Sequence, residues 1–126
     1  MKSIARWFLR LAVLYLLVGV GFGIYMAITK SFTFTPLHAH LNLLGWVSMA
    51  LFAFFYRSWP AIAESTLAKV HFWLYVPAHF VQMICLYVFL SGNTAIDPVL
   101  GLASMLVAVG VICFAINVWK IGRAHV

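Results

Sequence analysis

Charged residues, and acidic ones above all, are nearly absent from this chain of 126 residues. Only 8% of the residues are charged, whereas 66% are hydrophobic. A soluble globular domain carries roughly 25% charged residues, so the composition excludes that class. The two acids are Glu64 and Asp97, both in predicted loops. The long apolar segments therefore contain no carboxylate that would bind a metal ion or carry protons.

Cysteine is also scarce. Cys85 and Cys113 lie in different apolar segments, and the sequence has no Cys-x-x-Cys or Cys-x-x-Cys-His motif. Those motifs hold zinc or attach heme covalently, so sites of that form are excluded. An isolated cysteine in an apolar segment is typically a small buried hydrophobic side chain, and we predict that role for both.

Four long apolar segments make up most of the chain, at about residues 7–28, 37–56, 70–90 and 98–119. Each is close to the roughly 20 residues that a helix needs to cross a bilayer. The first is longer than the apolar region of a typical signal peptide, so we expect it to be retained. The sequence therefore predicts an all-α integral membrane protein, a four-helix bundle with a single domain over residues 1–126.

The basic residues predict the orientation of this bundle. The first loop contains a single base, Lys30, and the third loop contains none; the other seven bases are Lys2, Arg6, Arg10, Arg57, Lys69, Lys120 and Arg123. The positive-inside rule then places both termini and the middle loop in the cytoplasm of a bacterial-type inner (plasma) membrane. Because the bases flank apolar segments, they indicate contact with membrane lipid and no nucleic acid.

Aromatic residues gather near the predicted cytoplasmic ends of the segments. Interfacial belts of this kind are typical of membrane proteins. His71 stands beside Phe72 and Trp73, so we predict that it anchors the third segment at the interface. The predicted belt consists of Trp7, Tyr56, Trp59, Trp73 and Trp119.

Two histidines open the second apolar segment, in the sequence His38-Ala39-His40. Ionisable side chains are costly in a bilayer and therefore indicate a functional site, and imidazole is a common ligand of metals and of heme iron. Residues two apart on a helix are separated by about 200° around its axis, so the two rings cannot chelate one ion together. They can serve two centres, or one can bind while the other forms a hydrogen bond. Asn42 lies on the side of His38 and is predicted to orient its imidazole.

His79 lies near the middle of the third segment and permits three interpretations. It can satisfy a carbonyl group freed by Pro77, with Gln82 as an alternative donor. It can also bind a metal ion or take part in a proton relay. From the helical rise per residue, His79 is predicted to lie about 10 Å deeper than His40, which makes the two a poor pair for one heme.

Residues 37–49, continuing through Tyr56, Arg57 and Pro60, resemble the tenth helix of the catalytic subunit of heme–copper oxidases, in the form found in nitric oxide reductases. In that family the first histidine of a His-x-His pair binds a high-spin heme and the second a low-spin heme, on opposite faces. Residues 69–74 are similar to the start of the family's next helix. The resemblance implies heme b as the cofactor, with His38 and His40 as ligands of heme iron.

The resemblance also implies that one chain is incomplete. The family's subunit has twelve helices in three arcs of four, and this chain has the length of one arc. The adjacent His-His pair of the family's copper site does not occur here. We therefore expect no complete oxidase or reductase, and a heme held between His40 of one copy and His38 of the next, in a homotrimer or alternatively a dimer.

Three functions follow as hypotheses. The first is a b-type cytochrome-like protein that carries electrons to a redox partner, or binds or senses a gas or other ligand. The second is a membrane module in which histidines of neighbouring subunits hold copper or zinc. The third is an accessory membrane protein that has no cofactor.

Overall fold

The computed structural model describes residues 3–123, which form helices and no strand. In chain order the elements are α1 (Ser3–Thr29), α2 (Thr35–His40), the π-helical turn η1 (Leu41–Val47), α3 (Ser48–Ser58), α4 (Pro60–Ala63), α5 (Thr66–Leu90), the 3₁₀ turn η2 (Thr94–Ile96) and α6 (Asp97–Trp119). Lys2, one of the bases used to predict the orientation, lies outside the described residues, as does the C-terminal tail beyond Arg123.

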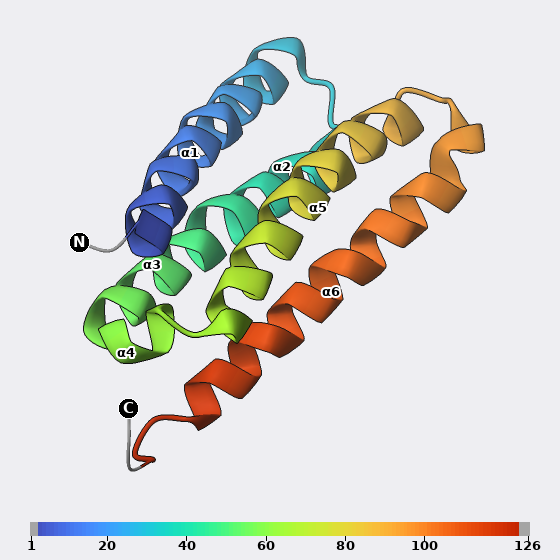
Figure 1. The fold of residues 1–126 in the computed structure, drawn as a ribbon. Coiled ribbons are helices and arrows are strands. Elements are labelled where there is room, and N and C mark those ends of the chain that lie inside the picture. The colour runs from blue at the N-terminus through green and yellow to red at the C-terminus, as the bar shows by residue number, and fades with distance from the viewer. Residues whose placement is uncertain (1–2, 124–126) are drawn as a thin grey trace.

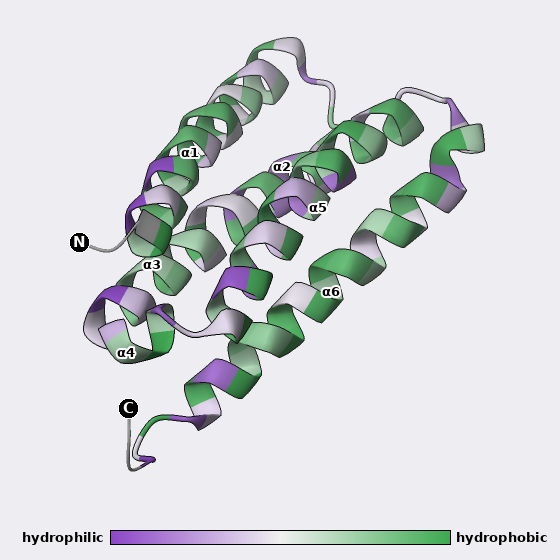
Figure 2. Ribbon diagram, viewed as in Figure 1, coloured by the Kyte–Doolittle hydropathy of each residue, from purple (hydrophilic) through white to green (hydrophobic). Residues whose placement is uncertain are grey.

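Four helical stretches are long and apolar enough to cross a membrane: Ile4–Thr29, Thr35–Ser58, Thr66–Leu90 and Thr94–Trp119. The predicted all-α class is confirmed, and each predicted segment lies within one of these helices. The second stretch is continuous through α2, η1 and α3, and is called the second span below. Figure 2 shows hydrophobic residues along the lengths of the helices and hydrophilic residues concentrated near α4 and the helix ends.

The helices begin earlier than the hydropathy pattern predicts, for local reasons. The second span begins at Thr35 because Pro36 is tolerated in the first turn of a helix, where its missing N–H would be unbonded in any case. α5 begins at Thr66 because the Oγ of Ser65 accepts a hydrogen bond from the backbone N–H of Ala68, at 3.2 Å. The predicted loop between the second and third segments contains the short helix α4.

The helices pack as two close pairs. α1 packs along η1 and α3, and α5 packs along α6. Figure 1 shows the resulting antiparallel arrangement, in which the start of α1, the turn at α4 and the end of α6 lie toward the same end of the bundle. Fewer backbone contacts join one pair to the other, so side chains must make most of the connection.

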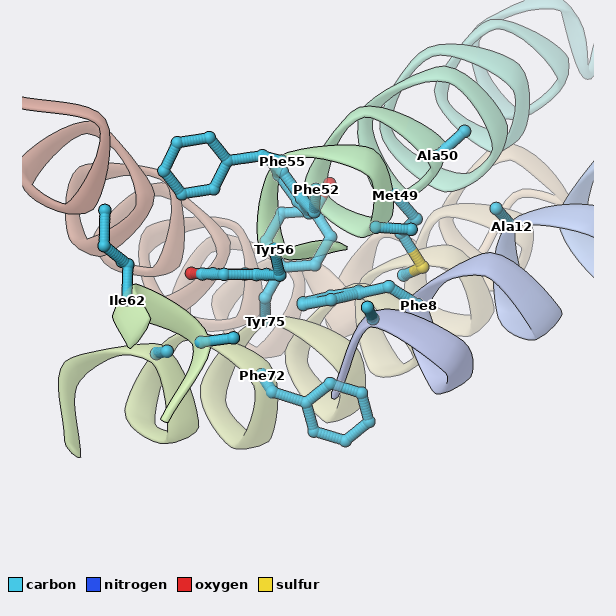
Figure 3. Packing of buried hydrophobic residues seen from close by; sticks show 14 of the residues in the cluster. Phe8, Ala12, Met49, Ala50, Phe52, Phe55, Tyr56, Ile62, Phe72 and Tyr75 are labelled. Carbon is cyan, nitrogen blue, oxygen red and sulfur yellow. The ribbon is translucent and has the colours of Figure 1, made fainter. Parts of the chain in front are cut away.

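Aromatic rings make that connection. Phe8 of α1 lies edge-on to Phe52 of α3, at 5.3 Å between centroids, and stacks on Tyr56 at 6.0 Å. Phe52 in turn contacts Tyr75 of α5 at 5.0 Å and Phe114 of α6 at 4.5 Å. Figure 3 shows the rings of Phe8, Phe52, Tyr56 and Tyr75 gathered between the helices. Because lipid removes most of the hydrophobic drive for association between helices, such packing contacts hold a membrane bundle together.

Glycine permits close approach between neighbouring helices. A Cβ atom built on Gly45 of η1 would lie 2.7 Å from both Cβ and Cγ of Tyr15 on α1. On α6, a Cβ atom on Gly110 would lie 3.1 Å from Cβ of Tyr75. A larger residue at either position would push one helix of the pair away from the other.

We expect Gly45→Ala to destabilise the protein by about 1–3 kcal/mol, because the added methyl group collides with the rigid start of the Tyr15 side chain. The matched control is Gly21→Ala, since nothing lies within 4 Å of a Cβ at that position. Thermal unfolding in detergent, followed by circular dichroism, measures both. Equal melting temperatures for the two variants would contradict the proposed close packing at Gly45.

Candidate functional site

His38 lies near the end of α2 and faces α1. Its Nδ1 is 2.9 Å from the carbonyl oxygen of Gly19. A carbonyl oxygen only accepts hydrogen bonds, so Nδ1 carries the proton and donates. The ring also lies against Gly23, where a built Cβ atom would be 3.1 Å from Cε1 of the imidazole. The absence of a side chain at Gly23 thus makes room for the His38 ring against the backbone of α1.

His40 has a similar arrangement on its own helix. Its Nδ1 is 2.7 Å from the carbonyl oxygen of Pro36 and donates to it. In the described part of the chain, no hydrogen bond engages Nε2 of either His38 or His40. Both side chains are half-buried in the single chain. Each ring therefore keeps a lone pair on Nε2.

Asn42 contacts His38, as predicted from their spacing. Its Nδ2 donates to the backbone carbonyl of His38 at 2.9 Å and lies 3.4 Å from Nδ1 of the ring. The amide occupies the space where a Cβ atom on Gly19 would lie, at 2.7 Å from Nδ2. Since Nδ1 of His38 already donates to Gly19, Asn42 fixes the backbone of His38, and the Gly19 carbonyl sets the orientation of the ring.

His79 of α5 lies beside His40. Its ring is close enough to His40 to interact electrostatically with both the side chain and the backbone carbonyl, although without hydrogen-bond geometry. The predicted separation in depth of about 10 Å is wrong, because the ends of the two helices are not level. Phe34, which precedes α2, stacks on Tyr87 near the end of α5, with 5.0 Å between centroids. His40 follows Phe34 by six residues and His79 precedes Tyr87 by eight, so the two histidines lie at similar depths in the bundle.

The side chain of His79 is fully buried between two tyrosines. Its ring lies edge-on to Tyr15, at 4.8 Å between centroids, and parallel to Tyr75 at 5.8 Å. Neither ring nitrogen has a hydrogen-bond partner among residues 3–123, so the first of the three interpretations, a bond to a carbonyl freed by Pro77, does not hold. The alternative donor, Gln82, donates instead to Oγ of Ser104 on α6, at 2.9 Å.

The π-helical turn η1 starts directly after His40, and the sequence prediction of a regular helix there is wrong. Within η1 the backbone N–H of Ser48 bonds to the carbonyl of Leu43, five residues back. Two hydroxyl groups stabilise the widened turn: Oγ of Ser48 donates to the Leu43 carbonyl and the hydroxyl of Tyr75 donates to the Leu44 carbonyl, each at 2.7 Å. Single π-helical turns are frequent at functional sites.

A second polar group lies near the α4 end of the bundle. The hydroxyl of Tyr56 shares a hydrogen bond with Nδ1 of His71 at 2.8 Å and accepts a hydrogen bond from Nδ2 of Asn117 at 3.0 Å. All three side chains are fully buried. His71 is therefore enclosed within the bundle and is not an exposed interfacial anchor, because α4 contributes Ile62 and Ala63 to the core at this end.

An apolar groove lies between α1, the start of the second span and α5. It has two adjoining parts, of about 470 and 300 Å³, which share the side chains of Val18, Phe22 and Tyr87. These volumes are in the range of small-molecule sites, roughly 300–1,000 Å³. Neither part is lined by His38 or His40, so a group bound by those residues would lie outside this groove.

No cluster of three histidine, cysteine, aspartate or glutamate side chains that could hold a metal ion occurs within residues 3–123. No protein-family model matches the sequence, and no curated protein or solved structure matches it at a significant level. The relationship to heme–copper oxidases therefore remains a prediction from residues 37–49.

We expect Tyr56→Phe to cost about 1–3 kcal/mol of stability, because it leaves Nδ1 of His71 and the amide of Asn117 without their buried partner. Tyr25→Phe is the matched control, since Tyr25 is 49% exposed. Unfolding of both variants in the same detergent measures the difference. If Tyr56→Phe melts like the control, the three buried groups do not depend on this hydroxyl.

Proposed function

We propose that this chain is a heme-binding membrane protein in which Nε2 of His38 and Nε2 of His40 are ligands of heme iron. The supporting observation is that each imidazole donates its Nδ1–H to a backbone carbonyl. Metal-bound histidines almost always donate their second ring N–H in this way, which fixes the tautomer and the ring orientation. Both rings are thus already in the tautomer that metal binding through Nε2 requires, with the proton on Nδ1 and a lone pair on Nε2.

The number of available ligands favours heme over a bare metal ion. A porphyrin supplies the equatorial ligands, so iron needs only one or two histidines from the protein. Protein sites for zinc typically use three or four side chains, and copper sites commonly take several as well. A copper or zinc site here would therefore need several ligands from other chains, because the described residues bring no three together.

The site is completed by further copies of the chain. His38 and His40 are only half-buried, and polar groups left facing lipid are costly. A second copy that covers them removes this cost and supplies the opposite iron ligand. We favour a homotrimer in which His40 of one copy and His38 of the next hold one heme b, with a dimer as the alternative. Bound in this way, heme would let the protein exchange electrons with a redox partner.

The heme site is tested by absorption spectroscopy of the protein purified in mild detergent. We expect a Soret band and a reduced-minus-oxidised spectrum typical of b-type heme. His40→Ala and His38→Ala should each lower the heme content at least about tenfold, because each removes an iron ligand. The control is Leu43→Ala, a neighbouring side chain that is 61% exposed.

Three outcomes would reject this function. A colourless protein that takes up no heme on reconstitution would exclude it. Copper or zinc found by elemental analysis without heme would favour the bare-metal alternative. Normal behaviour of a His38/His40 double alanine variant would favour an accessory protein without cofactor. Mass photometry of the same sample gives the number of copies.

We further propose that both termini and the turn at α4 face the cytoplasm of a bacterial-type inner membrane. An impermeant thiol reagent applied to intact spheroplasts should then label Asn93→Cys, which lies in the exposed turn before η2. Ser58→Cys, at the end of α3, should react only after permeabilisation. The native Cys85 and Cys113 are buried and give little background. The reverse pattern would invert the orientation.

A further inference from the structure

We propose that the apolar groove between α1, the start of the second span and α5 binds one anionic phospholipid, from the membrane leaflet at the Thr29 end of α1. It is called the lipid groove below. Its two parts hold the acyl chains, and Lys30 binds the phosphate of the headgroup. The proposal does not depend on whether His38 and His40 bind heme.

The lipid groove covers the depth of one leaflet. Along α1 its lining extends from Tyr15 to Tyr25. These ten residues rise about 15 Å, which is half of the roughly 30 Å hydrocarbon core of a bilayer. An acyl chain of one leaflet has this reach, whereas a helix of a second copy that crosses the membrane would extend far beyond the groove. The length therefore favours a lipid as the occupant.

The form of the lipid groove also fits a molecule with two chains. Its parts, of about 470 and 300 Å³, adjoin at Val18, Phe22 and Tyr87. Aromatic rings hold the wall in place: Phe34 stacks on Tyr87, with 5.0 Å between centroids, and lies 6.1 Å from Phe22. Small-molecule sites are usually pre-formed, mostly apolar and lined by aromatic side chains in this way. A phospholipid can place one acyl chain in each part.

Hydrogen-bond donors lie at the headgroup end of the lipid groove. Figure 1 shows the ends of α1 and α5 toward the same end of the bundle. Tyr25 and Tyr87 lie in these last turns, line the groove and are about half-exposed. Neither hydroxyl has a hydrogen-bond partner within residues 3–123. Tyrosine is enriched at this level of membrane proteins, where its hydroxyl meets the polar headgroups.

Lys30 supplies positive charge at the same end. It directly follows α1, and its φ of 57° turns the chain out of the helix. In the described part of the chain its side chain has no ion-pair partner, and neither Glu64 nor Asp97 lines the groove. A lysine beside a membrane surface attracts anionic lipids, and its ammonium group donates to phosphate oxygens. Charge complementarity therefore favours an anionic headgroup over a zwitterionic one.

The acyl-chain site is tested through Gly21, which lines the lipid groove and has nothing within 4 Å of a built Cβ atom. Gly21→Phe should fill part of the groove without disturbing the bundle, and weaken phosphatidylglycerol binding at least about tenfold. Gly101→Phe is the matched control, because its Cβ position on α6 is equally open but lies outside the groove. Native mass spectrometry of the full chain in detergent, with added lipid, measures binding.

The headgroup site is tested by comparing phosphatidylglycerol with phosphatidylcholine of the same acyl chains. One lysine near the surface accounts for about a fivefold preference for the anionic lipid. Lys30→Gln should remove this preference and leave phosphatidylcholine binding unchanged. Equal affinity of the wild-type protein for the two lipids would overturn the assignment of an anionic headgroup.

The wild-type protein should retain one phosphatidylglycerol per copy, and a protein that retains none would overturn the proposal. So would equal binding by Gly21→Phe and Gly101→Phe when circular dichroism shows that both are folded. If Gly21→Phe lowers the number of copies but leaves lipid binding intact, the groove is a contact between copies and the proposal is wrong. Lipid binding is measured without heme, so the result is independent of the proposed iron ligands.

Discussion

The bundle depends on side chains of one helix reaching the backbone of the next. Glycine makes this possible on α1, where Gly19 and Gly23 leave space for Asn42 and for the ring of His38. The His38 imidazole then donates to the Gly19 carbonyl, and the Tyr75 hydroxyl reaches the Leu44 carbonyl across another interface. In an apolar surrounding these bonds replace those that water would make. They set the positions of the histidines and, through them, the chemistry that the site can carry out.

The sequence predicts the helices well and their polar contacts poorly. Hydropathy alone locates four membrane-crossing segments, and the helical repeat correctly places Asn42 on the side of His38. The repeat cannot predict that His40 and His79 are neighbours, because that depends on how far each helix is shifted along its partner. Nor can it predict the bond between Tyr56 and Asn117, which are 61 positions apart. Nothing in the sequence predicts the π-helical turn either, since Leu41–Val47 consists of residues that an ordinary helix also accepts.

The histidines fall into two groups that differ in what surrounds them. His38 and His40 are half-buried, each with one nitrogen bonded to a carbonyl and the other available. His71 and His79 are fully enclosed by aromatic rings of the same chain. The first group is only partly enclosed by its own chain, which fits the proposed ligand shared between copies. The second group is already shielded by its own chain.

The π-helical turn η1 also connects these two groups mechanically. It contains one residue more than an α-helical turn of the same length, so its loss would rotate everything after it by roughly 100° around the helix axis. Tyr56 lies on that side of the turn, and its hydroxyl would swing away from His71. The Tyr75 hydroxyl, which holds the turn through Leu44, belongs to the same row of α5 as His71 and His79. Loss of the turn that follows His40 would therefore break a hydrogen bond at the opposite end of the bundle.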